Sequence, residues 1–533
     1  MVDPALNVGV NLIEGRLSDI TNIAVGSKVI TQKLNAEESK QIMNNFKQKA
    51  LISALAGAGA LAMASAANAV YVNPDGLGQA LIYPYYTVRA GNVTLLSVVN
   101  TTTQAKAVKV RFLEGKNSQE VLDFNLFLSA KDVWTGVISP TADGAQVATL
   151  DKSCTNPSLF SDGARTVARP AAFRNFLFAT DVPALQTLDR TREGYVEMIE
   201  MATIDNLSPL GKDVTHVAGV PACKLTVDTS FLSASGLTVP SGGIFGNGTI
   251  LNALGGASTG YDAVAIDGFG WQRPPITFSG STAPTLSGVP GVGGTSKTSV
   301  VTNGGNLYIT NWSNTINAVS ATMMHDNVYG EYAYTTDGVI GTDWIVTMPT
   351  KNQYVNFAST PLPPFQNIWD KTNGVSCDDV ALNSTDREEF IGITNDDFSP
   401  RPPAAKGNSL CYEANVISFG GVSASGASLV TGSLNDVGIK PVQNQGLDVA
   451  VAGKEGGWLA LSFTNPGAFI AGTGEIINTS LSTGAPTTGV GTPLTYFGLP
   501  VVGFAMSGAA FKTGNPQQNY SNSYSLKFSR KIQ

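Results

Sequence analysis

The sequence predicts a mainly β fold: one or more antiparallel immunoglobulin-like sandwiches with long irregular insertions. Short stretches of alternating or β-branched residues recur along the chain, and turn-forming residues separate them. Hydrophobic residues make up 43% of the 533 residues, which is enough to bury a core and argues against global disorder.

The clearest strands follow one another early in the chain. Residues 107–113 alternate apolar with basic side chains, and residues 121–128 alternate again, which is the period of a half-buried strand. Residues 93–100 are apolar and β-branched, and residues 132–138 close the set. Four short strands with turns between them predict an antiparallel sandwich over residues 70–145.

Composition divides the rest of the chain into four regions. They are an irregular Gly/Ser/Thr/Pro-rich region at 146–300, a β region at 301–360, an acidic Pro- and Asp-rich loop at 361–415 and a C-terminal β region at 416–533. Three local predictions are a short helix near 182–191, a long loop or linker across 232–300 and a strand at 318–324.

Residues 43–69 have the three parts of a secretory signal peptide. A positively charged stretch at 43–49 precedes an uncharged apolar run at 50–64, and the small-x-small site Ala67-Asn68-Ala69 follows. A membrane-spanning helix would need ~20 strongly apolar residues, and this run is shorter and rich in Ala and Gly. The sequence therefore predicts export, and no transmembrane segment in the mature chain.

Residues 1–42 precede the signal peptide and have mixed charge without a clear period. Two readings stay open: a start codon placed too early, with Met43 as the true first residue, or a cytoplasmic extension. Under the first reading these residues are a non-native extension, and under either they are set apart from the fold.

All four cysteines follow the predicted cleavage site, and an even number in an exported chain favours disulfides. Pairing of sequence neighbours gives Cys154–Cys223 and Cys377–Cys411. Each bond would stabilise the protein by at most ~4 kcal/mol in the chain-entropy model and would require Cα separations of about 4.4–6.8 Å. A zinc site is disfavoured, because the spacing of His216 and Cys223 is poor for zinc.

The charge pattern limits the expected partners. Charged residues make up only 14% of the chain, the net charge is −7, and no long basic run occurs. Nucleic acid is therefore not an expected partner.

Three segments resemble stretches of uncharacterised secreted β-rich envelope proteins of Gram-negative bacteria. They are GQALIYPYY at 78–86, GTDWIVTMPTK at 341–351 and GLPVVGFA at 498–505. The resemblance covers a small part of the chain and implies export and β architecture. It transfers no activity and no catalytic residue.

Ser258 lies in a G-x-S-x-G sequence at residues 256–260, the pattern of a nucleophile elbow. That motif works where a strand leads into a helix, and here no apolar strand is expected before the serine. A base would have to be His216 or His325, the only two histidines. A chance match is the competing interpretation in so Gly- and Ser-rich a chain.

Acidic residues concentrate in the second cysteine region and form a candidate calcium site, because hard cations prefer carboxylate and carbonyl oxygens. The candidate ligands are Asp378, Asp379, Asp386, Glu388, Asp396 and Asp397. A solvated acidic loop is the alternative, and no other cofactor is expected.

Aromatic residues could stack on sugars, but most of them sit in strand patterns, where rings usually fill a core. The candidates are Tyr83, Tyr85, Tyr86, Trp134, Trp312, Trp344 and Trp458.

Together these features favour a non-enzymatic structural or interaction protein of the cell surface or periplasm of a Gram-negative bacterium, of the surface-layer or matrix type. Self-assembly or contact with other envelope components would supply its partners. The alternatives are an envelope glycan- or ligand-binding module and, third, a secreted serine hydrolase.

We expect the mature protein to begin at Val70, because the small-x-small site ends at Ala69. Mass spectrometry of the protein isolated from its native cells measures this directly. Peptides from residues 1–42 on the mature molecule would refute the prediction.

Overall fold

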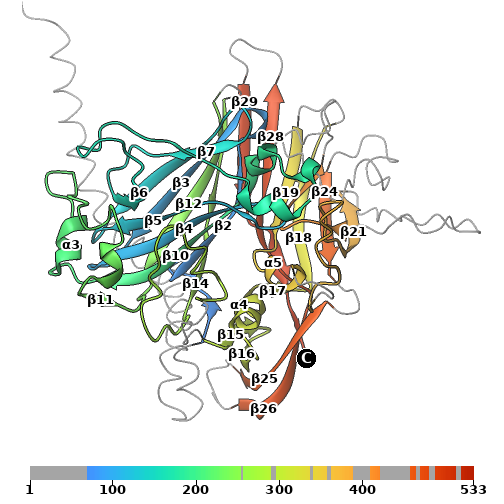
Figure 1. Ribbon diagram of the computed structural model, residues 1–533. Coiled ribbons are helices and arrows are strands. Elements are labelled where there is room, and N and C mark those ends of the chain that lie inside the picture. Colours follow the sequence, from blue (N-terminus) through green and yellow to red (C-terminus); the bar gives the residue numbers. More distant parts are fainter. Residues whose placement is uncertain are drawn as a thin grey trace, which may run out of the picture. The chain divides into compact units, whose positions relative to one another are not determined.

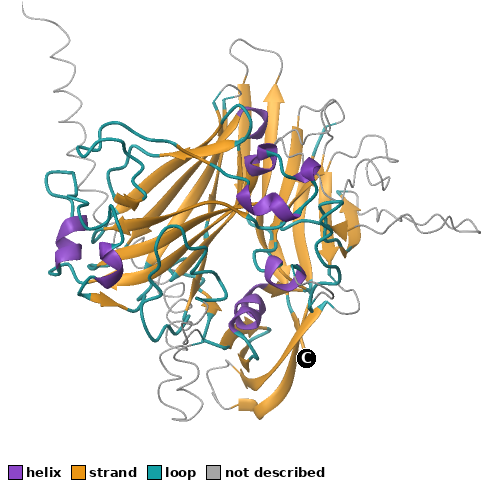
Figure 2. Ribbon diagram, viewed as in Figure 1, coloured by secondary structure: helices purple, strands orange, loops and turns teal. Residues whose placement is uncertain are grey.

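Antiparallel strands dominate the computed structural model of the protein, and helices are few and short (Figure 1, Figure 2). The mainly β fold is thereby confirmed, whereas the immunoglobulin-like topology stays a prediction. The structure describes residues 69–253, 256–289, 296–335, 340–356, 362–387, 409–419, 456–463, 468–478, 486–511 and 518–533.

The first sheet is built around β10 (Glu193–Ile204), which is buried along its whole length. In spatial order its strands are β1 (Tyr71–Val72), β14 (Val264–Asp267), β2 (Ala80–Thr87), β10, β4 (Ala105–Glu114), β5 (Glu120–Leu128) and β8 (Cys154–Asn156), with β11 (Leu237–Thr238) paired to the end of β10. Pro84 is tolerated in β2 beside a register shift of β10 between Gly194 and Val196, because proline cannot donate to a regular ladder.

The second sheet packs against the first and has six strands. In spatial order they are β13 (Ala257–Asp262), β12 (Ile244–Asn252), β3 (Asn92–Asn100), β6 (Val133–Pro140), β7 (Ala145–Ala148) and β9 (Ala171–Ala172).

Large rings and glycines fit together in the core between these two sheets. A Cβ atom at Gly136 would lie 2.4 Å from the Trp134 ring, and one at Gly248 would lie 2.1 Å from the Tyr261 ring. Both rings are almost completely buried. Larger residues at these glycines would therefore displace the rings, since cores are close-packed.

The later strands form further antiparallel sheets. One contains β15 (Thr298–Asn303), β16 (Asn306–Asn311), β25 (Phe469–Asn478), β26 (Pro486–Phe497) and β31 (Lys531–Ile532). A second contains β21 (Ala381–Asp386), β24 (Gly456–Ser462), β18 (Asn327–Ala333) and β30 (Lys527–Ser529), and a third contains β23 (Ala414–Phe419), β19 (Ile340–Thr347), β28 (Val502–Phe511) and β29 (Gln518–Tyr524). Two short pairs are β17 (Met324–His325) with β27 (Leu499–Pro500) and β20 (Asp378–Asp379) with β22 (Ser409–Leu410).

The core of the first two sheets continues into the third of these later sheets. Phe504 of β28 stacks on Tyr261 with ring centroids 4.5 Å apart, and the Thr347 hydroxyl donates to the Pro84 carbonyl at 2.6 Å. At the strand edges, the Ser521 hydroxyl of β29 donates to the Ser258 carbonyl of β13 at 2.6 Å. Strands more than 200 residues apart in sequence thus share one hydrophobic core.

Three local predictions were wrong. Residues predicted as a strand at 318–324 mostly form the helix α4 (Thr315–Met323), which begins at the Asn314 cap. The helix predicted near 182–191 is instead two 3₁₀ turns, Pro183–Leu185 and Leu188–Arg192. The predicted linker across 232–300 contains β12, β13 and β14.

The residue predicted to begin the mature chain lies inside the fold. Val70 is fully buried, and its backbone N–H donates to the Thr298 carbonyl at 2.8 Å. A protease would need this segment accessible, so any cleavage after Ala69 must precede folding of residues 69–72. None of the described helices is long and apolar enough to cross a membrane.

Ion pairs are buried at both ends of the sandwich. At one end the Lys106 ammonium lies 2.7 Å from the Glu200 carboxylate, and both side chains are fully buried. At the other end Arg190 contacts Glu114 at 2.6 Å and Asp181 at 2.7 Å. Removing one partner of such a pair leaves the other charge buried and unpaired, and this destabilises the protein by more than the pair itself contributes.

We therefore expect Glu200→Ala to lower the free energy of unfolding by about 3–5 kcal/mol, and the double variant Lys106→Met/Glu200→Leu to recover most of that loss. Urea unfolding of the purified protein measures both, and Lys224→Met at an exposed position is the control, expected within ~0.5 kcal/mol of the unmodified protein. A double variant as unstable as Glu200→Ala would contradict this account.

Candidate functional site

A group of buried ionisable side chains, most of them with shifted pKa values, lies on the outward face of the first sheet. Lys109 and Arg111 of β4 alternate with the core residues Val108 and Val110, so their side chains leave the sheet on the opposite side. The neighbouring strands β5 and β10 complete the group on the same face. We call Lys109, Arg111, Glu120, Asp123 and Glu197 the charged cluster.

Short ion pairs connect the charged cluster. The Lys109 Nζ lies 2.6 Å from Asp123 Oδ2. The Arg111 guanidinium bridges two carboxylates, with Nε 2.7 Å from Glu120 Oε2 and Nη1 2.5 Å from Glu197 Oε2. No side chain of the five is more than 11% exposed.

Burial perturbs the protonation of the charged cluster. Burial and the neighbouring Glu120 carboxylate raise the pKa of Asp123 to about 7, although the Lys109 ammonium opposes this. Burial also lowers the pKa of Lys109 and raises that of Glu197. Buried carboxyls and amines with shifted pKa values are typical of functional sites, but structural ion pairs share this property.

A segment from the predicted linker covers the charged cluster. Lys109 Nζ donates to the Ser279 carbonyl at 3.1 Å, and the Asn125 amide beside it donates to the Thr277 carbonyl at 2.8 Å. The carboxylates thus face cations and backbone rather than an open cleft. Such an arrangement can take up and release a proton at Asp123, but substrate access would require movement of residues 277–279.

The elbow predicted at Ser258 does not have elbow geometry. Ser258 is the second residue of β13 in an antiparallel hairpin, where it pairs with Leu251 of β12, and β13 leads to β14 rather than to a helix. The strained strand-to-helix turn that activates a nucleophile is therefore missing at this serine.

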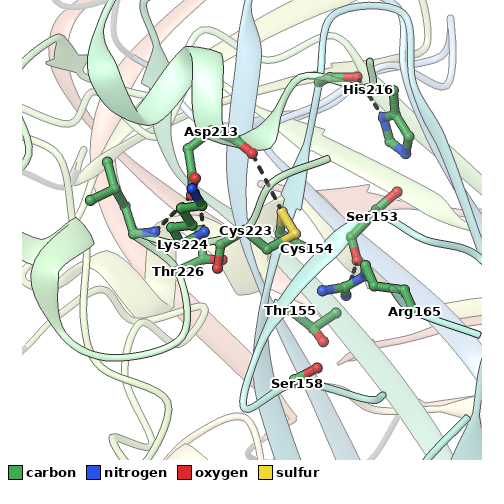
Figure 3. The surroundings of a disulfide bond; sticks show 12 residues. Ser153, Cys154, Thr155, Ser158, Arg165, Asp213, His216, Cys223, Lys224 and Thr226 are labelled. Atoms are coloured by element: carbon green, nitrogen blue, oxygen red, sulfur yellow. Dashed lines mark hydrogen bonds between the residues drawn. A yellow bond between two sulfur atoms is a disulfide. The ribbon is translucent and has the colours of Figure 1, made fainter. Parts of the chain in front are cut away.

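The two histidines are held by other partners. His216 Nδ1 lies 3.3 Å from the Ser129 hydroxyl and 3.6 Å from Asp132 Oδ2, near the first disulfide (Figure 3). A triad would place serine and carboxylate at opposite ring nitrogens, whereas both contacts here are at Nδ1. His325 is buried against Phe528, and burial together with Arg530 holds its pKa well below the ordinary value.

The candidate calcium ligands are only partly described. Asp378 is buried and its carboxylate lies 2.8 Å from the Lys351 ammonium, which supplies its counter-charge. Asp379 is exposed on β20, and Asp386 ends β21. Glu388, Asp396 and Asp397 lie outside the described residues. Where side chains are described, no group of three His, Cys, Asp or Glu side chains could hold a metal ion, and calcium at the full acidic set stays a prediction.

Both predicted disulfides are present. Cys154 of β8 is bonded to Cys223, which follows the helix α3 (Pro209–Val214), with Cα atoms 5.5 Å apart (Figure 3). Cys377 and Cys411 are bonded beside the β20–β22 pair, and their Cα separation of 3.7 Å is shorter than the expected range.

The aromatic candidates are mostly core residues. Tyr83, Tyr85, Tyr86, Trp134 and Trp344 are fully buried, and Trp312 is 6% exposed. Trp458 is 44% exposed on β24. These seven residues therefore form no common sugar-binding platform.

A groove that the sequence did not indicate lies between β12–β13 and β28–β30. Its volume is about 570 Å³, and Asn247, Asp262, Phe504, Tyr524 and Phe528 line it. The Asn247 amide donates to Asp262 Oδ1 at 2.5 Å, and the Tyr524 hydroxyl donates to the Glu331 carbonyl at 2.6 Å. The residues on its two sides lie more than 200 positions apart in sequence, so no local motif could reveal it.

Comparison with protein-family models, curated proteins and solved structures finds no match for this chain. The resemblance of residues 78–86, 341–351 and 498–505 to secreted envelope proteins stays a prediction.

We expect Asp123 to make stability depend on pH. Because its pKa in the folded protein is raised to about 7, the stability this carboxyl contributes is fully present below about pH 4 and is lost as the pH rises through 7. The unfolding free energy of the unmodified protein, measured relative to that of the Asp123→Asn variant, should therefore fall by on the order of 1–3 kcal/mol between pH 4 and pH 8.

Urea unfolding at the two pH values measures this difference. Asp143→Asn, at an exposed carboxylate, is the control and should show a nearly constant difference. An equally constant difference for Asp123→Asn would mean that Asp123 titrates near its ordinary pKa.

Proposed function

We propose that this protein is an exported, non-enzymatic structural or interaction protein of the bacterial cell surface, of the surface-layer or matrix type, with an immunoglobulin-like sandwich as its framework. The observation that carries the proposal is that the buried charged side chains of β4 and β10 are paired with opposite charges and covered by other parts of the chain. The Lys106–Glu200 pair and the charged cluster are the examples. Groups arranged in this way stabilise a fold, whereas catalysis needs them to converge in an accessible cleft.

Export is the second part of the proposal. The signal peptide predicted at 43–69 and two disulfides both suit an oxidising compartment outside the cytoplasm. Disulfides also suit a protein that persists in the envelope, because they constrain the unfolded chain.

A second candidate function is binding of an envelope glycan or another ligand. The groove beside Asn247 and Asp262 favours it, because paired amide and carboxylate groups are suited to sugar hydroxyls. However, the Tyr261 and Phe504 rings stack on each other and are only 7% and 6% exposed, so neither offers an open face to a sugar. A serine hydrolase has the least support, since Ser258 lies in a hairpin and the histidines have other partners.

Surface labelling of intact cells tests the proposed location. We expect a membrane-impermeant amine reagent to label this protein in intact cells as strongly as a known surface protein, because many of its lysines, such as Lys224, are exposed. A periplasmic protein serves as the control and should be labelled only after the outer membrane is permeabilised. Labelling that follows the periplasmic control would refute the surface location and favour the ligand-binding alternative.

A further inference from the structure

We infer that the outer face of the second sheet binds a second copy of this chain. The inference rests on the proposed structural function, and it names the surface through which copies would associate. We call this surface the open face: the outward side of β13, β12, β3 and β6.

Strand pairing fixes which side chains belong to the open face. Val99 of β3 lies opposite Val133 on one side and Phe245 on the other. Leu95 likewise lies opposite Val137 of β6 and Thr249 of β12. Since alternate residues share a face, these cross-strand pairs form two parallel, mainly apolar rows, and the polar row of Asn247, Ser97 and Thr135 lies between them.

The rows are accessible to a partner. Leu95 is 39% exposed and Val133 is 43% exposed, whereas their chain neighbours Leu96 and Trp134 are buried in the core. Exposed large apolar side chains in two rows of one small uncharged face differ from singly scattered surface residues, because exposed apolar patches mark interaction sites.

The open face carries almost no charge. Its outward positions on β3, β6 and β12 are Val, Leu, Ser, Thr, Phe and Asn, without a lysine, arginine, aspartate or glutamate. The carboxylate at its margin is Asp262 of β13, whose Oδ1 accepts from the Asn247 amide. The net charge of −7 therefore lies elsewhere on the chain. A strongly basic or acidic partner would find no complementary charge here, whereas an identical uncharged face fits without leaving a charge unpaired.

The area of the open face suits a weak dimer. The longest strands of the face, β3 and β12, have nine residues each. At ~3.3 Å per residue and ~4.8 Å between strands, the four strands make a face of roughly 600 Å². Two such faces would bury roughly 1,200 Å², which is the lower end of the range for specific interfaces. Two twisted sheets pack face to face at about 30°, and a two-fold axis lets each row of one copy meet a row of the other.

Salt should strengthen this association. The two copies repel each other through their net negative charge, while the interface itself is uncharged, so screening removes only the repulsion. An interface made of ion pairs would respond in the opposite direction.

Sedimentation velocity of the exported full-length mature protein, over a range of concentrations and at low and high salt, tests the inference. We expect a monomer–dimer equilibrium that shifts towards dimer with salt. Leu95→Glu and Thr135→Glu should each weaken dimerisation at least tenfold, because each would bury an unpaired charge in the interface. Thr135 is exposed and polar, so this second variant tests the face with little risk to folding.

Matched controls place the same charge outside the open face. Leu150 is 81% exposed and Val217 is 72% exposed, and Leu150→Glu and Val217→Glu should dimerise like the unmodified protein. Circular dichroism and thermal melting check that all four variants are folded.

A protein that stays monomeric at the highest concentration would overturn the inference, and so would dimers that Leu95→Glu and Thr135→Glu leave unchanged. The second result would leave the proposed function intact, because assembly would then use another surface. A periplasmic location in the labelling experiment, together with dimers that both variants disrupt, would instead refute the proposed function and leave the open face as the dimer interface.

Discussion

Pairing of the charges on β4 and β10 is the constraint on which the rest of the structure depends. These two central strands bury Lys106, Lys109, Arg111, Glu114, Glu193, Glu197 and Glu200. Each unpaired charge in such a position would cost several kcal/mol, so every one of them needs a partner close by. Some partners come from within the sheet, as Glu197 does for Arg111. Others must be brought from distant parts of the chain.

The irregular segments supply those distant partners. The 3₁₀ turns after β9 carry Arg190 to Glu114, the connection before β12 places the Ser241 hydroxyl 2.7 Å from the Lys106 ammonium, and residues 277–279 cover Lys109. Ordering long connections that have little regular structure costs conformational entropy. Here their backbone carbonyls and side chains satisfy buried charges, which explains why segments of low hydrophobicity pack against the first sheet.

Sequence reasoning succeeded where the signal was local. The period-two alternation of residues 107–113 and 121–128 predicted β4 and β5, and the order of the cysteines predicted both disulfides.

Sequence reasoning failed where tertiary contacts determine the local structure. The composition of residues 232–300 predicted a linker, and the consecutive residues Gly246-Asn247-Gly248 are typical of a turn. However, Gly246 and Gly248 belong to a strand, where they are needed beneath the Tyr83 hydroxyl and the Tyr261 ring. The strand at 318–324 was wrong for a related reason, since an almost fully buried helix such as α4 lacks the polar stripe that marks helical periodicity. The contacts of the charged cluster with Glu197 and with residues 277–279, and the two sides of the groove, join positions far apart in sequence, which no local pattern encodes.

The two outer faces of the sandwich differ in a way that bears on how the protein meets its surroundings. The outward face of the first sheet carries the charged cluster at its middle, and the chain's own segments cover it. The outward face of the second sheet is uncharged, and Leu95 and Val133 on it are accessible. The covering segments form hydrogen bonds with charged groups that have lost contact with water. The uncharged face can instead be exposed at small cost in the monomer and buried at small cost against another surface.

The edge of the second sheet is also protected. An exposed strand edge can pair with another chain, but at the β13 edge the serine hydroxyls of β29 donate to the Ser258 and Gly260 carbonyls. The inferred association of two copies would thereby use the face and not the β13 edge, which would favour a closed pair over open-ended strand addition at that edge.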